Sequence, residues 1–321
     1  MKLVVQIPCF NEAETIPAVL ANIPRDLEGI ASVTVLVVDD GSSDGTAAIA
    51  KEAGADVVVQ HPQNRGLAAT FATGIEEALR LGADIIVNTD GDHQYPGASI
   101  KELVGPIVEG KADIVIGNRD PTRSPDVPRI KRLMYALGNF VVRQVTGIQV
   151  HDAPSGFRAM SRDFAQHTHL TNAFSYTLET LFTAAERRCT LVEIPIRPNP
   201  KLRESRLFGS LSEYVRRSAG IILKAYAMHK PMRAFGWLSL PFILLGLGLG
   251  VRFLYYFLED PERSGHIQSL ILAAISTLVG VQIFIFGMLG ELVRTNRLLL
   301  QKILSRSEGD SSSIETEEEK P

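Results

Sequence analysis

Asp90 and Asp92 stand one residue apart in the sequence, separated by Gly91. Two carboxylates at this spacing can both reach one hard cation or its ligands, and glycine lets the backbone turn closely around such a site. Magnesium in proteins is normally held by one or two carboxylates together with substrate phosphates and water, and Gln94 could add a carbonyl oxygen. An ordinary Asp-Gly turn is the alternative. The apolar run Ile85–Val87 directly before the motif favours a functional site, because it places the acids at the end of a strand.

A second acidic pair, Asp39 and Asp40, follows another apolar run. Helix capping by Ser43 or Asp44 explains part of this segment, but it does not require two adjacent acids. Either acid could accept a hydrogen bond from a nucleobase N–H or a ribose hydroxyl. A dinucleotide site also places an acid after the second strand, but it requires G-x-G-x-x-G after the first. Residues 8–13 contain no glycine, so a nicotinamide dinucleotide is excluded.

Several basic residues could converge on phosphate groups, although each one alone is by default a solvated surface cation. One of them, Arg158, ends a polar loop that starts at Asp152 and that could also be an ordinary turn. Nucleic acid is the rival ligand, but the net charge is −3 and aromatic residues are not interleaved with these bases. We therefore expect phosphate ligands and no nucleic acid. The candidates are Arg119, Lys131, Arg132, Arg158, Arg203 and Arg206.

These motifs lie far apart in the sequence, and the pattern of apolar residues predicts the fold that brings them together. Short strand-like runs alternate with helical stretches, which predicts an α/β domain with a mostly parallel sheet and helices on both faces. Ligands of such sheets bind outside the carboxyl ends of the strands, where the acids and Arg119 stand. The expected strands are 2–7, 33–38, 56–60, 85–89 and 114–117, and the expected helices are 15–22, 45–53, 67–81 and 99–109.

The composition also bears on disulfide bonds, histidine metal sites and disorder. Two cysteines, Cys9 and Cys189, cannot make a disulfide framework, and no histidine has the neighbours of a metal site. The near-neutral total hides segregation, since residues 307–321 hold six acids and one base while residues 201–233 hold eight bases and two acids. We expect the acidic end to be disordered.

Two long apolar runs indicate a membrane hairpin. Residues 237–258 carry one charge, Arg252, and residues 267–290 carry none. At about 1.5 Å per residue each run can cross a hydrocarbon core of about 30 Å. A pair of buried helices in a large soluble core is the alternative. Bases flank the outer ends, while the loop between the runs has only Arg263, so both termini and the first domain should be cytoplasmic.

The chain is thus expected to divide into four parts. These are a cytosolic domain (1–209), an amphipathic juxtamembrane helix (210–233), a transmembrane hairpin (234–291), and a cytoplasmic helix end with an acidic tail (292–321). A homo-oligomer is expected, and the two spans could pack between its subunits, although no small-residue motif fixes their number.

Several ordered motifs resemble glycosyltransferase family 2, and specifically the polyprenyl-phosphate glycosyltransferases that include dolichol-phosphate mannose synthase. The resemblance covers about the first 210 residues, and the two-span C-terminal hairpin is similar to that of bacterial members. The matching segments are IPCFNEAETI (7–16), VVDDGSSDGT (37–46), NRGLAAT (64–70), NTDGDHQYP (88–96), GNR (117–119), DAPSGFRAM (152–160) and RESRL (203–207).

The resemblance implies a nucleotide-binding glycosyltransferase A-type fold and assigns residues to roles. A divalent metal, Mg²⁺ or Mn²⁺, would be held by Asp92 and Gln94, and catalysis would use Asp90, Asp92 and Arg119. The family often has Arg and Ser where this chain has Lys131 and Tyr135. The nucleotide-sugar would contact Pro8, Asn11, Glu12, Asp39, Asp40, Asp90 and Arg206, and the acceptor phosphate would contact Lys131, Arg132, Tyr135 and Arg158.

The resulting hypothesis is a membrane-anchored inverting glycosyltransferase. It would move a sugar from a nucleotide diphosphate sugar (a UDP-sugar or GDP-mannose) to polyprenyl phosphate at the cytoplasmic face. The acceptor oxygen is already ionised at neutral pH, so the site must mainly position two substrates and stabilise the leaving diphosphate. The alternatives are a family 2 transferase that elongates another lipid-linked or polysaccharide acceptor, and a non-catalytic membrane-tethered nucleotide-sugar binding protein.

Overall fold

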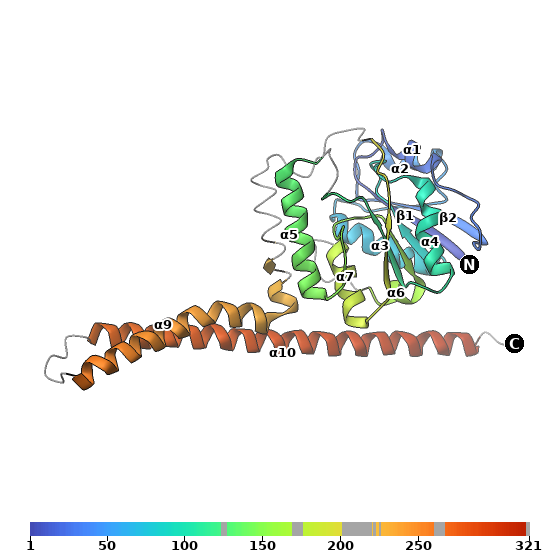
Figure 1. The fold of residues 1–321 in the computed structure, drawn as a ribbon. Coiled ribbons are helices and arrows are strands. Elements are labelled where there is room, and N and C mark those ends of the chain that lie inside the picture. The colour runs from blue at the N-terminus through green and yellow to red at the C-terminus, as the bar shows by residue number, and fades with distance from the viewer. Residues whose placement is uncertain are drawn as a thin grey trace. The chain divides into compact units, whose positions relative to one another are not determined.

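A computed structural model describes residues 1–122, 127–168, 176–200, 220, 223–224, 226–259 and 267–318 (Figure 1). The chain divides into two compact units, Met1–Ser218 and Ala219–Pro321. Each unit is described by itself below. Most of the expected juxtamembrane helix (210–233), together with Arg203 and Arg206, lies outside the described residues.

The first unit is built on a seven-stranded sheet with the order β3-β2-β1-β4-β6-β5-β7. Every neighbouring pair is parallel except for β6, which runs antiparallel to both β4 and β5. The five strands expected from the sequence are confirmed to within about two residues, whereas β6 and β7 were not predicted. The strands are β1 (Lys2–Cys9), β2 (Ser32–Asp39), β3 (Val57–Gln60), β4 (Ile85–Asn88), β5 (Ile114–Asn118), β6 (Arg158–Ser161) and β7 (Leu191–Pro195).

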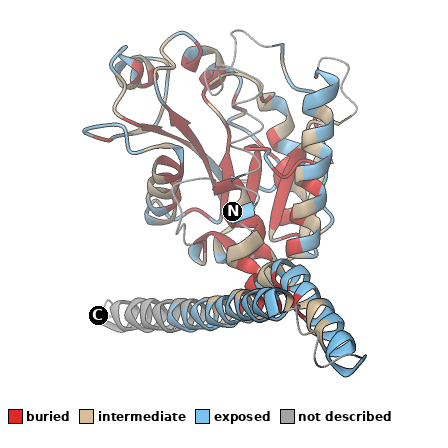
Figure 2. Ribbon diagram, turned by 90° about the vertical axis from the view of Figure 1, so that its left-hand side faces the viewer, coloured by how far each residue is buried: buried red, intermediate tan, exposed pale blue. Residues whose placement is uncertain are grey.

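Helices cover both faces of this sheet, as the buried strands in Figure 2 show. Along β1, Leu3, Val5 and Ile7 face one apolar cluster and Val4 faces the other, because successive strand residues point to opposite faces. The first cluster includes side chains of α1, α2 and α4, and the second includes those of α3, α5, α6 and α7. The helices are α1 (Ile16–Ala21), α2 (Thr46–Glu52), α3 (Leu67–Arg80), α4 (Ile100–Val108), α5 (Arg129–Thr146), α6 (Arg162–Gln166) and α7 (Tyr176–Arg187), with a short 3₁₀ turn at Gly97–Ser99.

The strand order creates a crevice beside β1. The chain proceeds from β1 to β2 and β3 on one side, then crosses to β4 on the other side. In open α/β sheets this switch point, at the carboxyl ends of the strands, is where ligands bind. Because β1 and β4 pair in parallel, with Gln6 opposite Asn88, the segments that follow both strands meet at this edge.

The second unit contains the two long helices α9 (Pro231–Glu259) and α10 (Ile267–Glu318). Pro231–Glu259 and Ile267–Asn296 are long and apolar enough to cross a membrane. Their large apolar side chains are mostly exposed, with Trp237 and Leu258 each 72% accessible, unlike those of a core helix. α10 continues to Glu318 and so includes most of the acidic segment for which we expected disorder; glutamate is a good helix former. The four-part division of the chain stays a prediction.

Glycines bring α9 and α10 close together. A Cβ on Gly246 would lie 2.9 Å from the carbonyl oxygen of Ala273, and one on Gly280 would lie 3.0 Å from the backbone nitrogen of Ile243. Lipid provides no hydrophobic force between apolar helices, so close backbone packing is a main source of their association. These contacts fix the antiparallel register of the hairpin.

Replacing Gly246 by leucine should therefore loosen the hairpin. The new side chain meets backbone atoms that cannot move aside, and overpacking of this kind costs roughly 1–3 kcal/mol. We expect a lower midpoint of thermal unfolding for the full-length protein in detergent micelles. Gly248→Leu is the matched control, since nothing lies within 4 Å of a Cβ at Gly248. Equal midpoints for the two variants would contradict the packing.

Candidate active site

The Asp90–Asp92 turn lies at the edge of the sheet where β1 and β4 end. Thr89 continues the pairing by donating its N–H to the carbonyl of Gln6 (3.1 Å). Gly91 is needed for close approach, since a Cβ there would lie 2.9 Å from Cys9 Sγ. Its carbonyl accepts a hydrogen bond from Thr15 Oγ1 (2.6 Å), which ties the turn to the loop after β1. The expectation that the acids stand at a strand end is thus confirmed.

Gln94 holds the carboxylate of Asp92 in position. Its side-chain Nε2 donates to Oδ2 (2.7 Å), and its backbone N–H donates to Oδ1 (3.1 Å). We expected the side-chain carbonyl oxygen of Gln94 to be a metal ligand. In this structure the side-chain amide of Gln94 instead donates to the Asp92 carboxylate and orients it. Orientation of this kind tunes a ligand even when the orienting group does not itself reach the metal.

Asp90 is the most perturbed carboxyl group at this edge. Burial, with the nearby charge of Asp92, raises its pKa to about 7, although Arg119 acts in the opposite direction and Glu12 adds to the rise. The backbone at Gly156 also approaches Asp90 closely, since a Cβ on Gly156 would lie 2.9 Å from Asp90 Oδ1. The acids in the crevice therefore repel one another, and a bound cation would reduce this repulsion.

The donor set fits a metal that is shared with a substrate. Among the described residues, no group of three or more His, Cys, Asp or Glu side chains is arranged to hold a metal ion. Asp90 and Asp92 alone would leave most positions of an octahedral ion to phosphate oxygens and water. This partial coordination is the usual arrangement for Mg²⁺ in enzymes that act on nucleoside phosphates.

Arg119, directly after β5, is fixed by a two-pronged ion pair. Its Nε and Nη2 donate to Asp152 Oδ2 (2.8 Å) and Oδ1 (3.0 Å), and its guanidinium lies 5.7 Å from the ring centre of Tyr95. Burial disfavours its charge, but Tyr95 and Asp152 outweigh burial and raise the pKa of Arg119 well above its usual value. Arg119 is therefore a permanent cation close enough to Asp90 to lower the pKa of that carboxyl.

Arg158, which we expected at the acceptor phosphate, faces the protein interior in this structure. Its side chain is fully buried in β6, and its guanidinium donates to the carbonyls of Ala153 (2.7 Å), Ser155 (2.8 Å) and Thr177 (2.7 Å), and also to Thr180 Oγ1. These bonds hold the loop before β6 against α7. That loop carries Gly156, so Arg158 acts on the site by positioning the backbone behind Asp90.

Asp39 and Asp40 also turn inward. Their residues are 0% and 3% exposed, so neither carboxylate is open to a nucleoside in this structure. Asp39 accepts from Gln60 Nε2 (2.9 Å) and from Ser42. Asp40 accepts from His61 Nδ1 (2.8 Å) and from two backbone N–H groups of the turn before α3, at Arg65 (2.9 Å) and Gly66 (2.8 Å).

The hydrogen bonds to Asp40 keep it ionised. Burial by itself raises its pKa, but the bonds from His61, Arg65 and Gly66 outweigh burial and lower the pKa. In the structure both acids anchor loops of the rim, and no local pattern in the sequence predicts this inward orientation.

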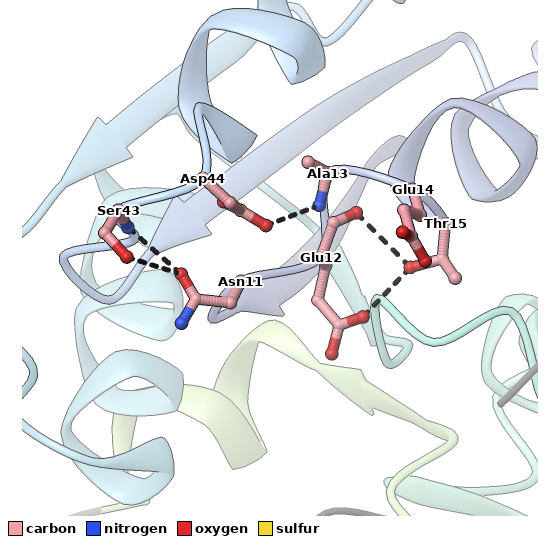
Figure 3. Close-up of a pocket in the computed structure, with 7 residues that line it drawn as sticks. All are labelled: Asn11, Glu12, Ala13, Glu14, Thr15, Ser43 and Asp44. Atoms are coloured by element: carbon pink, nitrogen blue, oxygen red, sulfur yellow. Dashed lines mark hydrogen bonds between the residues drawn. The ribbon is translucent and has the colours of Figure 1, made fainter. Parts of the chain in front are cut away.

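A pocket of about 580 Å³ lies beside the turn, between the segments that follow β1 and β2 (Figure 3). Asn11 adopts a left-handed backbone conformation (φ 55°), and its side-chain oxygen accepts from the Ser43 N–H (3.0 Å). Glu12 accepts from Thr15 Oγ1 (2.9 Å). Asn11 and Glu12 were expected at this site. The full lining is Asn11, Glu12, Ala13, Glu14, Thr15, Ser43 and Asp44.

Sequence reasoning missed part of this lining. Asp44 accepts from Thr46 N (3.1 Å) and Thr46 Oγ1 (2.5 Å), but the N-cap residue of α2 is Gly45 and not the expected Ser43 or Asp44; Asp44 also accepts from Ala13 N (3.1 Å) in the facing loop. No feature of the sequence pointed to Thr15 as a lining residue, since an isolated threonine is compatible with any turn. Pro8 is buried within β1 opposite Val38 and does not line the pocket.

Three of the expected acceptor residues lie on α5. Lys131 is exposed, and Arg132 is half-buried with its Nε donating to the carbonyl of Val127 (2.7 Å). Tyr135 lies close enough to Arg119 to affect the pKa of Arg119. Arg206, expected at the nucleotide, lies outside the described residues.

The raised pKa of Asp90 predicts a pH-dependent gain in stability for Asp90→Asn. Because the folded state prefers the neutral acid, wild-type stability falls as pH rises from about 4 through about 7. The amide cannot ionise, so the variant should unfold at a higher temperature than wild type at pH 8, with a smaller difference at pH 5. Calorimetry of the full chain in detergent with EDTA measures this. The exposed Asp26→Asn is the control, and a pH-independent difference would refute the assignment.

The ion pair between Arg119 and Asp152 predicts a large structural penalty. Asp152→Ala leaves the guanidinium without its carboxylate, and breaking a buried pair from one side typically costs about 3–5 kcal/mol. We expect a large drop in the denaturation midpoint for this variant. Glu109→Ala, which removes the exposed partner of Lys111, should change the midpoint little. Similar midpoints for the two variants would show that the buried pair is dispensable.

Comparison with known proteins identifies the relatives of this architecture. Glycosyltransferase AglJ of Haloferax volcanii is 32% identical over 294 residues, covering 89% of this chain and 91% of that protein. Polyprenol monophosphomannose synthase of Mycolicibacterium smegmatis is 29% identical over 206 residues, covering 61% and 76% respectively.

A solved structure, glucosyl-3-phosphoglycerate synthase from Mycobacterium tuberculosis in complex with Mn²⁺, UDP and phosphoglyceric acid, shares the fold. Its TM-score is 0.55 at 20% identity, and the match covers 70% of this chain and 78% of that one. The fold of the first unit thus occurs in a known architecture. Residues 4–168 match Glycosyl transferase family 2, and together with the relationship to the Haloferax glycosyltransferase along nearly its whole length this shows that the chain is a family 2 glycosyltransferase.

Proposed function

We propose that this glycosyltransferase moves a sugar, with inversion, from a nucleotide diphosphate sugar to polyprenyl phosphate at the cytoplasmic face of a membrane. The observation that carries the proposal is a crevice with two adjacent carboxylates and a fixed arginine, in a chain that also has two apolar helices of membrane-spanning length. The first feature suits a diphosphate leaving group with its metal. The second suits an acceptor that cannot leave the bilayer.

The donor is assigned to the crevice and the adjoining pocket. Asp90 and Asp92, with Gln94 orienting Asp92, would hold Mg²⁺ or Mn²⁺ against the diphosphate. The nucleoside would occupy the pocket at Asn11 and Glu12, with Pro8, Asp39 and Asp40 supporting it from beneath. Solved family neighbours contain UDP with Mn²⁺ or Mg²⁺, and a Methanococcus voltae relative, 27% identical over 212 residues, is a UDP-N-acetylglucosamine–dolichyl-phosphate N-acetylglucosaminyltransferase. These likenesses support a UDP-sugar, with GDP-mannose as the other candidate.

The chemistry needs charge stabilisation more than proton transfer. When bound, the metal supplies a counter-charge for the leaving diphosphate. Arg119 adds a second positive charge at the edge, which Asp152 and Tyr95 keep in one orientation. A phosphate monoester is an ionised nucleophile at neutral pH, so the protein contributes mainly alignment of the two substrates.

The acceptor phosphate is assigned to α5. Lys131 and Arg132 supply cations there, and Tyr135 lies toward Arg119. A Micrococcus luteus relative, 28% identical over 222 residues, is an undecaprenyl-phosphate mannosyltransferase. Positive flanks of the hairpin favour cytoplasmic termini. A homo-oligomer stays a prediction.

Asp92→Ala tests the metal assignment. We expect transfer to fall by at least about 100-fold, because charge stabilisation of the leaving group is lost, while the circular dichroism spectrum stays unchanged. Labelled donors are incubated with undecaprenyl phosphate and metal, and the chloroform-soluble monosaccharide product is counted. Glu76→Ala, on the exposed face of α3, serves as the control.

The same assay separates the alternatives. Full activity of Asp92→Ala with metal supplied would refute the metal assignment. Polymeric or oligosaccharide-lipid product from the wild type would favour an elongating transferase, and donor binding without any product would favour a non-catalytic binding protein.

A further inference from the structure

Basic residues gather at the open end of the hairpin in the second unit. Lys230 directly precedes α9, Arg233 lies in its first turn, and Arg294 lies on α10. The register of the two helices brings these positions together. A Cβ on Gly290 would lie 2.8 Å from Pro231 Cβ, so Lys230 is beside the turn of α10 that runs from Glu291 to Arg294.

Lys230 lies close enough to Arg233 and Arg294 to be repelled by both. Burial lowers the pKa of Lys230, and the charges of Arg233 and Arg294 lower it further. One acid compensates in part, since Arg294 Nη1 donates to Glu291 Oε1 (3.0 Å). Arg294 Nε is buried and has no hydrogen-bond partner among the described residues. Among the residues that the structure describes, these three cations and Glu291 gather at this end of the hairpin, and Arg294 Nε is left as an unused donor.

We propose that Lys230, Arg233 and Arg294 form a binding site for the phosphate headgroup of a lipid. The site lies where the apolar part of both helices ends, which is the depth of the headgroups for a membrane-inserted hairpin. Basic pockets between membrane helices bind anionic headgroups in this way. An anion there relieves the mutual repulsion and accepts the N–H of Arg294. The inference rests on the proposed membrane insertion, and it is independent of glycosyl transfer.

The competing explanation is that these bases only set the orientation of the hairpin. Positive flanks do so through total charge, without a defined ligand geometry. A site differs from a flank because its selectivity depends on the residues that converge. Arg252, a cation farther along α9 with its guanidinium 6.0 Å from the ring of Tyr256, allows the two explanations to be separated.

Trp237 is a built-in probe for the experiment. It is the single tryptophan, it is 72% exposed, and it lies four residues after Arg233, hence on the same face of α9. The full-length protein is reconstituted in phosphatidylcholine vesicles that contain brominated phosphatidylglycerol or, at equal mole fraction, brominated phosphatidylcholine. Bromine quenches tryptophan on contact, so the ratio of the two quenching constants reports selectivity for the anionic headgroup.

We expect the wild type to be quenched more strongly by the anionic lipid. Lys230→Gln and Arg294→Gln should each reduce the selectivity by about fivefold, whereas Arg252→Gln should leave it unchanged. Glu291→Gln removes the competing carboxylate and should increase it. Circular dichroism checks the folding of each variant, and the opposite sign expected for Glu291→Gln keeps the test decisive if a cationic variant misfolds.

Two further outcomes complete the test. Unbrominated undecaprenyl phosphate is added to vesicles with brominated phosphatidylglycerol: recovery of fluorescence identifies the phosphate monoester as the preferred lipid, and no recovery identifies the bulk anionic lipid. The proposal is overturned if the wild type shows no preference and undecaprenyl phosphate has no effect, or if Arg252→Gln lowers selectivity as much as Lys230→Gln. None of these readouts requires transferase activity, so a failed transfer assay leaves the result unaffected.

Discussion

Repulsion among carboxylates at the end of β4 shapes the rim of the catalytic unit. Asp90, Asp92 and Glu12 share one crevice, and the pKa of Asp90 rises to about 7 as a result of burial and its acidic neighbours. The surrounding residues hold each of these groups in place. Gln94 fixes Asp92, Thr15 fixes the carbonyl of Gly91, and Arg119 supplies the opposing charge. The stored repulsion is the physical basis for expecting a cation here.

The deeper supports of the site are themselves polar and buried. Asp152 pairs with Arg119, and Arg158 uses its guanidinium to join the loop before β6 to α7. Buried charges are costly unless they are hydrogen-bonded: Arg119 donates to both carboxylate oxygens of Asp152, and Arg158 donates to three carbonyls and the Thr180 hydroxyl. These residues specify one conformation of the loop that carries Gly156. They act on the site by positioning the backbone.

The two helices of the hairpin associate through close backbone packing and not through burial of polar groups. Its apolar side chains point outward, and its helices approach through Gly246, Gly280, Gly287 and Gly290. Close backbone approach is effective in lipid, where apolar burial gains little. The same packing brings Lys230 beside Arg294 at one end. The register that joins two apolar helices therefore also concentrates positive charge.

Local pattern in the sequence was sufficient for the parallel core, the acidic turn and the hairpin. Apolar runs, their spacing and the residues that follow them are local properties, so β1 to β5 and the position of Asp90 at a strand end could be read directly. Only the tertiary structure decided that β6 enters antiparallel, that Arg158 is buried, that Asp39 and Asp40 point inward and that Gln94 donates to Asp92. Each of these depends on the direction of a side chain or on which strands become neighbours. The deciding partners are often distant in sequence, as Arg119 is from Asp152 and Arg158 from Thr177, and no local pattern encodes such pairings.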